Sequence, residues 1–252
     1  MPRPTRATAS GDVGTTLRCR RCCFGPLCLP GGVQPAEVAL LDGVVEARRT
    51  LAAGEVLVQA DAPFRALYAV RSGSLKSQVR CGERVQVLAF HFPGELAGWD
   101  GIGHGRHRVE VVALEPSSVC LIRYHRLMGL ADRIPRLYRR LLALMAGATQ
   151  CDWTVAVAGP GGDAEQRVLA FLLNLAERRL AAGLAVDEVR LGMSRDDIAS
   201  YLGLAPETVS RAMVRVSRSG LVRIHRRRVR FGDLEALRAA VLSGCPELAA
   251  AE

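Results

Sequence analysis

The segment "SRDDIASYLGLAPETVSRAMVRVSRSG", residues 194–220, has the pattern of two short helices separated by a sharp turn. Ser194 is placed to cap a helix that runs through Leu202, and the residues Gly-Leu-Ala that follow predict a tight turn. Pro206 stands in the first turn of a second helix, where proline is tolerated, and Gly220 stands where helices commonly end. The segment therefore predicts a helix-turn-helix, and "LVRI" and "VRF" after it predict a small β-hairpin, or wing.

The second helix of this pair presents polar side chains that suit DNA reading. Glu207, Ser210, Arg211 and Arg215 lie at helical spacing on one face, opposite apolar positions that can pack inward. An arginine matches the major-groove edge of guanine, and a carboxylate accepts from the amino group of cytosine. We therefore expect this helix to read base pairs.

The charge distribution points to the same end of the chain. The net charge is +9, and residues 211–230 hold eight arginines and no acidic residue. A local basic block is typical of a phosphate-binding surface, although a solvated arginine-rich surface would have the same composition. Arg195 at the start of the first helix and Arg227 in the wing are predicted to contact DNA, the latter through phosphates that set the register.

Length and composition exclude several protein classes. The chain has 252 residues, which suggests one large domain or two ordinary ones, and 49% of them are hydrophobic, enough for a core without disulfides. It has no apolar run of eighteen residues, and "MPRPTRATASGDVGTT" lacks the apolar centre of a secretory signal. These features predict a cytoplasmic protein with no membrane partner, in which thiols stay reduced.

The segment from Thr50 to about Arg126 alternates short β-type runs with glycine turns, which predicts a sandwich, roll or barrel. After Pro135, "IPRLYRRLLALMAGATQCDWTVAVA" predicts one long amphipathic helix, and "GPGG" at 159–162 predicts a linker. The steps of four and three along this helix resemble a coiled-coil seam. That seam would consist of Leu141, Met145, Ala148 and Val155, with Asp152 between the last two.

Four of the eight cysteines fall within ten residues, at Cys19, Cys22, Cys23 and Cys28. Clustered cysteines in a reducing compartment indicate a metal, redox chemistry or catalysis rather than disulfides. Three ligands at this spacing leave a tetrahedral site one ligand short, and zinc and iron–sulfur clusters are comparable candidates on spacing alone. Cys19, Cys23 and Cys28 form an alternative spacing, so the spacing does not decide between Cys22 and Cys23.

The chain resembles the FNR branch of the CRP/FNR transcription regulators. "DDIASYLGLAPETVSR" resembles the recognition region of that branch, "LYAVRSGSLKS", "FHFPGELAGWDGIG" and "SSVCLIRY" resemble its β-roll, and Cys19-x2-Cys22-x5-Cys28 resembles its cluster motif. The resemblance covers about Cys19 to Leu237. It departs from the family at Ala205, where a threonine N-cap is common, and at the wing turn "HRRR", where glycine would be expected.

The resemblance implies a fold and a ligand set. The fold class is α+β: an N-terminal cyclic-nucleotide-binding-like β-roll (jelly roll), a long dimerisation helix and a C-terminal winged helix-turn-helix. The fourth ligand of a [4Fe–4S] cluster would be Cys120, with Cys19, Cys22 and Cys28 as the others. The base-contacting residues of the family fall on Glu207, Ser210 and Arg211.

The resemblance also implies the function and the partners. A cluster-bearing homodimer would bind an inverted repeat of TTGAT-type half-sites in double-stranded DNA, and oxygen would degrade the cluster and release the DNA. RNA polymerase would be the partner of an activator, with the turn at Gly82 and Glu83 as its candidate contact. An acid aligned with Asp152 is also part of the resemblance, and its repulsion across the seam would keep the cluster-free protein monomeric.

The sequence lacks the residues that cyclic-nucleotide binding or a cupin-like metal site would require. A cyclic-nucleotide pocket needs an arginine followed by serine or threonine, whereas Arg106 and Arg108 precede His107 and Val109. A cupin-like metalloenzyme needs a His-x-His pair, which His104 and His107 do not form. No arrangement of nucleophile and base stands out, so no enzyme is predicted. A structural zinc, or a different small-molecule effector, remains as the alternative cofactor.

The expected domain organisation follows from these assignments. It consists of a disordered arm (1–16), a cysteine segment (17–32), the β-roll (33–133), the dimerisation helix (134–160), the winged helix-turn-helix (161–240) and a tail (241–252).

Overall fold

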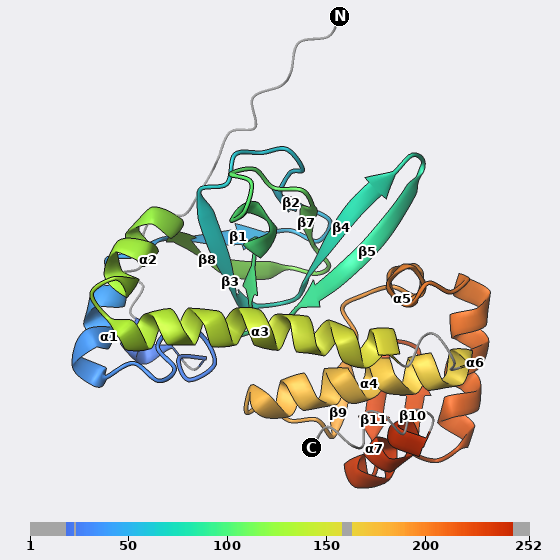
Figure 1. The fold of residues 1–252 in the computed structure, drawn as a ribbon. Coiled ribbons are helices and arrows are strands. Elements are labelled where there is room, and N and C mark those ends of the chain that lie inside the picture. The colour runs from blue at the N-terminus through green and yellow to red at the C-terminus, as the bar shows by residue number, and fades with distance from the viewer. Residues whose placement is uncertain (1–18, 23, 158–162, 244–252) are drawn as a thin grey trace, which may run out of the picture.

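The computed structural model describes residues 19–22, 24–157 and 163–243, and it describes residues 149–157 by their backbone alone. The expected arm at 1–16 and the tail from 244 onward lie outside the described residues. The predicted fold class is confirmed: a β-roll is followed by one long helix and a winged helix-turn-helix domain (Figure 1). No helix in the described part of the chain is long and apolar enough to cross a membrane.

The N-terminal domain is a roll of two antiparallel sheets. One sheet has the strand order β1-β8-β3-β6 and the other has the order β2-β7-β4-β5. Apolar side chains that alternate along the strands meet between the sheets, as expected of half-buried strands. Its elements are η1 (Cys19–Arg21), α1 (Pro35–Leu41), β1 (Val45–Leu51), β2 (Val56–Val58), β3 (Ala66–Ser72), β4 (Leu75–Cys81), β5 (Arg84–His91), β6 (Leu96–Ala97), η2 (Trp99–Gly101), β7 (Glu110–Ala113), β8 (Ser117–Arg123) and α2 (Tyr124–Ala131).

The β4–β5 hairpin projects from the roll, with its tip at the upper right of the view, and its strand β5 contacts α5 of the C-terminal domain (Figure 1). Its two strands pair from Leu75 with His91 to Cys81 with Arg84. Gly82 makes the turn at a φ of 64°, which favours glycine because it lacks a Cβ. Strand β5 is the outer strand of its sheet, so one backbone edge of it is left without a strand partner.

Helix α3 (Pro135–Val157) crosses below the roll (Figure 1). It carries apolar side chains on two faces. Leu137 and Leu141 are buried in a core shared with the roll. Tyr138, Leu142 and Met145 are large side chains on the exposed face. The structure therefore corrects the predicted seam at Leu141, which is 5% exposed because the roll covers it.

The remaining seam residues fall into two groups. Met145 and Ala148 lie on the exposed part of α3, as the prediction requires. The side chains of Asp152 and Val155 lie outside what is described, so their place in the seam stays a prediction.

The C-terminal domain begins with α4 (Ala164–Ala181), which lies beside α3 (Figure 1). The predicted helix-turn-helix and wing are both present. A further strand, β9, extends the wing into a sheet of order β10-β11-β9, which the sequence did not predict. The elements after α4 are β9 (Glu188–Arg190), α5 (Arg195–Leu202), α6 (Pro206–Arg218), β10 (Val222–His225), β11 (Arg228–Phe231) and α7 (Leu234–Ser243).

Local capping explains the helix-turn-helix. The Ser194 side chain accepts from the backbone N–H of Asp197, and the Asp197 carboxylate accepts in return from the N–H of Ser194. Gly203 ends α5 in the left-handed conformation, at a φ of 65°. Ala205 caps α6 without a side-chain hydrogen bond, as its departure from the family pattern predicts.

Candidate cysteine centre and DNA interface

The structure brings the four predicted ligands together. Cys19 lies in η1, Cys22 and Cys28 lie in the loop after it, and Cys120 lies on β8, yet all four line one small cavity. The rest of this lining is mainly backbone and apolar side chains. The loop is fixed at its start because the N–H of Cys19 donates to the Asp42 carboxylate at 2.7 Å. Cys23 lies outside the described residues, and Cys81 is exposed on the hairpin, away from this cavity.

Electrostatics at this site oppose free thiolates. Burial, together with the nearby Cys28, Asp42 and Cys120, raises the pKa of Cys19 to about 12. Burial also raises the pKa of Cys28 to about 12, against a hydrogen bond from the backbone of Leu29 that lowers it. The pKa of Cys120 is raised by burial as well. Buried thiols that line one cavity can ionise together only if positive charge is bound in it, as iron or zinc would supply.

The donor set fits an iron–sulfur cluster. Four cysteine thiolates are the usual ligands of [4Fe–4S], and a structural zinc ion accepts the same four. No three histidine, cysteine or acidic side chains in the described part of the chain gather closely enough to hold one metal ion. Cys19, Cys22, Cys28 and Cys120 are the residues that would hold a cluster around the cavity.

Arg140 of α3 is hydrogen bonded to the cysteine loop, a contact that the sequence did not predict. Its guanidinium donates to the backbone oxygens of Cys28 and Pro26, each at 3.0 Å, and to that of Leu27. The close approach depends on Gly31, where a Cβ would overlap the Pro26 carbonyl oxygen and lie 3.0 Å from the Arg140 guanidinium carbon. The only sequence signal for this role is a charged residue beside the inward-facing Leu137 and Leu141.

The recognition helix α6 presents its predicted face to solvent. The side chains of Glu207, Ser210 and Arg211 are exposed, while Val209, Met213 and two further apolar residues are buried beneath them. Arg215 is also exposed and pairs with Glu165 of α4 at 2.8 Å. The polar face of α6 is therefore free to enter a major groove.

The arginines around the wing are not equivalent. Arg227 is exposed at the wing turn, as a phosphate contact requires. Arg195 is half-buried: it donates to the Arg226 carbonyl oxygen at 2.8 Å and to the Met213 sulfur, and burial lowers its pKa. Arg195 thus braces the wing turn against the helices. The prediction that it contacts DNA is untested.

The wing turn places a non-glycine residue in a left-handed backbone conformation, as the absence of glycine from its sequence suggests. Arg226 has a φ of 56°, in the left-handed region that glycine adopts without strain. The structure also adds an acidic residue that the sequence analysis missed, because Glu188 on β9 bonds Arg228 and Arg230 at 2.6 Å each. The alternation of charges along a three-stranded sheet becomes visible only once β9 is known to pair with β11.

His91, His104 and His107, all in the described part of the chain, have separate surroundings. A ring nitrogen of His91 is hydrogen bonded to the Ser77 hydroxyl at 2.7 Å, and burial lowers the pKa of His91 to about 4. His107 is buried and faces the Asp100 carboxylate at 3.2 Å, whereas His104 is exposed. Arg106 and Arg108 are both exposed.

Comparison with known proteins finds matches for both domains of the chain. Residues 48–133 match the family of cyclic nucleotide-binding domains, and residues 166–240 match that of Crp-like helix-turn-helix domains. The chain is 40% identical over 222 residues to the transcriptional regulatory protein btr of Bordetella pertussis, covering 87% of this chain and 91% of that protein. It is 34% identical over 226 residues to the fumarate and nitrate reduction regulatory protein of Escherichia coli (strain K12), covering 89% and 90%.

A solved structure supports the same relationship. FixK2 from Bradyrhizobium japonicum is 29% identical, with a TM-score of 0.67, and the match covers 77% of this chain and 96% of that one. The similarity thus extends through both domains and the helix between them.

Proposed function

The chain is a transcription regulator of the CRP/FNR family, and we propose that it responds to oxygen through a [4Fe–4S] cluster held by Cys19, Cys22, Cys28 and Cys120. The observation that carries this proposal is the convergence of three loop cysteines with Cys120, a residue ninety-two positions beyond Cys28, on one cavity. Thiols brought together at such sequence separation suit a bound cationic centre, and burial disfavours the free thiolates of Cys19, Cys28 and Cys120. When bound, the cluster would supply the oxygen-labile chemistry.

The cysteine loop is mechanically linked to the dimerisation helix. Arg140 ties three loop carbonyls to α3, so a change in the loop changes the support of that helix. On the opposite face of α3, Tyr138, Leu142 and Met145 form an exposed apolar stripe that suits a second copy of the chain. The proposed homodimer would pair along this stripe and along Ala148, Asp152 and Val155 further on.

Asp152 is the proposed element of control in that pairing. Two carboxylates brought together in a seam repel each other and are costly to desolvate. The cluster-free protein would therefore stay monomeric, and an intact cluster would stabilise the loop and α3 enough to allow pairing.

The dimer would bind DNA with an inverted repeat of TTGAT-type half-sites. Glu207, Ser210 and Arg211 would contact base edges, and Arg227 and Arg215 would contact phosphates. The exposed positions of these residues support this assignment. The turn at Gly82 and Glu83, at the tip of the β4–β5 hairpin, is the proposed contact for RNA polymerase.

Purification without oxygen tests the cofactor. We expect broad visible absorption with bound iron and sulfide, which bleaches in air together with the loss of DNA binding. Colourless protein with one zinc ion for each chain would overturn the cluster, and a sharp Soret band would indicate haem instead.

A cysteine-to-serine series tests the ligands. Cys19→Ser, Cys28→Ser and Cys120→Ser should each abolish the colour and the oxygen-sensitive DNA binding, whereas Cys81→Ser should change neither. A protein that keeps its colour without Cys22 but loses it in Cys23→Ser would replace Cys22 by Cys23 in the ligand set.

A further inference from the structure

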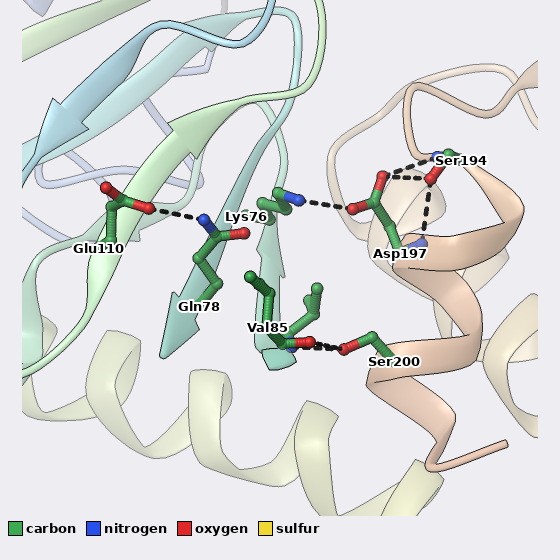
Figure 2. Close-up of polar contacts among 8 residues, drawn as sticks. Lys76, Gln78, Val85, Glu110, Ser194, Asp197 and Ser200 are labelled. Carbon is green, nitrogen blue, oxygen red and sulfur yellow. Dashed lines mark hydrogen bonds and ion pairs between the residues drawn. The ribbon is translucent and has the colours of Figure 1, made fainter. Parts of the chain in front are cut away.

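Helix α5 closes the open edge of the sensor sheet. The Ser200 hydroxyl donates to the carbonyl oxygen of Val85 at 2.9 Å and accepts from the N–H of Val87 at 2.8 Å (Figure 2). Gln86 of β5 adds a hydrogen bond to the backbone oxygen of Ser200. One serine thus satisfies the donor and the acceptor that an edge strand leaves unpaired, and it joins the first helix of the helix-turn-helix to the sensor.

An ion pair lies beside this contact. Lys76 Nζ on β4 is 2.6 Å from the Asp197 carboxylate, and both side chains are largely buried, at 17% and 15% exposure (Figure 2). Asp197 is also the residue that caps α5 by bonding Ser194, so Lys76 holds the start of that helix. Hydrogen bonding to Lys76 and Ser194 outweighs burial and lowers the pKa of Asp197, which keeps it charged. Lys76 is the single lysine of a chain otherwise supplied with arginine.

Apolar packing joins the two domains at the same place. Val87 and Phe90 of β5 are each 2% exposed and belong to the core of the DNA-binding domain. The Phe90 ring lies 5.0 Å from that of Tyr201 on α5 and 6.1 Å from that of Phe171 on α4. The orientation of α5 relative to the sensor is therefore set by buried side chains as well as by polar contacts.

A second contact prevents rotation about this one. Gly192, just before α5, packs so closely on the sensor that a Cβ there would overlap the Ser74 hydroxyl and approach the Glu115 carboxylate to 2.8 Å. Two separated contacts define an orientation, whereas one contact would allow rotation about it.

We propose that Lys76 is a positioning residue for DNA recognition: through Asp197 and α5 it fixes the recognition helix relative to the sensor, and so fixes the half-site spacing that the dimer accepts. The reasoning is geometric. A dimeric helix-turn-helix protein reads two half-sites only if its recognition helices are held about one turn of DNA apart. A rigid junction in each subunit makes that distance constant, and a loose junction lets each helix find its half-site independently. This inference rests on the proposed dimeric binding to an inverted repeat.

The spacing preference of a junction variant provides the test. Affinities are measured for oxygen-free protein on DNA duplexes whose two half-sites are separated by spacers changed one base pair at a time, and on a duplex with one half-site. Lys76→Gln should lower affinity at the preferred spacing by about fivefold to tenfold and flatten the preference, with single half-site affinity unchanged. Lys76→Arg, which keeps the charge, should retain the preference. Arg80→Gln removes an exposed positive charge from the same strand and should behave as wild type. A Lys76→Gln protein with the wild-type spacing preference would overturn the inference.

The single lysine allows an independent test that needs neither cluster nor DNA. Acetylation by an amine-reactive ester, followed by peptide mass spectrometry, reports the access to Lys76 separately from the N-terminal amine. In Arg80→Lys protein, Lys76 should react at least tenfold more slowly than the lysine introduced at position 80, and Gly192→Ala should remove most of that difference. Equal rates in the parent background would show that the ion pair does not hold in solution and would overturn the proposal. A wild-type protein that is colourless or monomeric without oxygen would contradict the proposed cluster mechanism. The acetylation rates do not depend on the cluster, so they would still test the role of Lys76.

Discussion

Replacing Arg140 by glutamine should loosen the cysteine loop from α3. Glutamine keeps hydrogen-bonding capacity but is shorter and uncharged, so it cannot span three carbonyls. Two of the three bonds, to Cys28 and Leu27, are partly buried, and the third, to Pro26, is exposed. Hydrogen bonds to charged groups contribute about 1.5–3 kcal/mol each, and partial solvation places these two at the lower end. Because water replaces the exposed bond, the expected loss is about 2–3 kcal/mol in the free energy of unfolding.

Urea denaturation of air-exposed, cluster-free protein measures this loss without the cofactor. Arg139→Gln is the matched control, because Arg139 is the exposed neighbour on the same helix and loses the same charge. In oxygen-free protein, Arg140→Gln should keep the visible absorption but dimerise more weakly, as judged by sedimentation. Surface substitutions usually change the unfolding free energy by no more than about 0.5 kcal/mol. An Arg140→Gln value within about 0.5 kcal/mol of the Arg139→Gln value, with unchanged dimerisation, would refute a role for Arg140 in linking the loop to α3.

Three further predictions concern base reading, pH and the seam. Arg211→Ala should weaken binding to a TTGAT-type site by about 1–3 kcal/mol and relax discrimination at the guanine, whereas Arg227→Ala should weaken specific and non-specific DNA equally; equal losses in both variants on all DNA would contradict these roles. Burial lowers the pKa of His91 from 6.5 to about 4, so between these two pH values His91 is protonated in the unfolded chain and neutral in the folded protein. This stabilisation is therefore complete above pH 6.5 and is lost as the pH falls towards 4, by at most about 3 kcal/mol, and urea titrations of His91→Gln should show a smaller loss. Asp152→Ala should be dimeric and bind DNA in air without a cluster, and a monomer on sedimentation of that variant would show that the carboxylate is not the switch.

Local signals made the helix-turn-helix predictable. Ser194 caps α5, Pro206 begins α6, and the turn between the helices follows Gly203, all within a few residues of the backbone groups that they satisfy. The same applies to the wing, where the expectation of a glycine-type turn at "HRRR" agrees with the positive φ of Arg226. Interactions that span three or four residues can be read from the sequence because chain geometry alone brings the partners together.

Long-range packing made other features unpredictable. Leu141 (i, i+4) and Leu142 (i, i+3) fit a seam with Met145 equally well, and only the position of the roll shows that Leu141 faces inward. Arg140 and Lys76 have no local motif, since their partners lie 112 and 121 residues away. The sequence pattern identifies an apolar face, but the neighbour that covers each face depends on the tertiary fold.

The predicted boundary between sensor and DNA-binding domain separates residues that share one core. Val87 and Phe90 belong to the roll by sequence, yet they pack with Phe171 of α4 and Tyr201 of α5. If the DNA-binding domain turned away from the roll, these side chains would be exposed and the edge of β5 would lose Ser200 as its partner. Both losses oppose such a movement because buried apolar area and satisfied backbone groups favour the docked arrangement. A cluster bound as we propose would therefore have less to move than a domain: it would act on α3 through Arg140, and the recognition helix would follow as part of a body that includes β5.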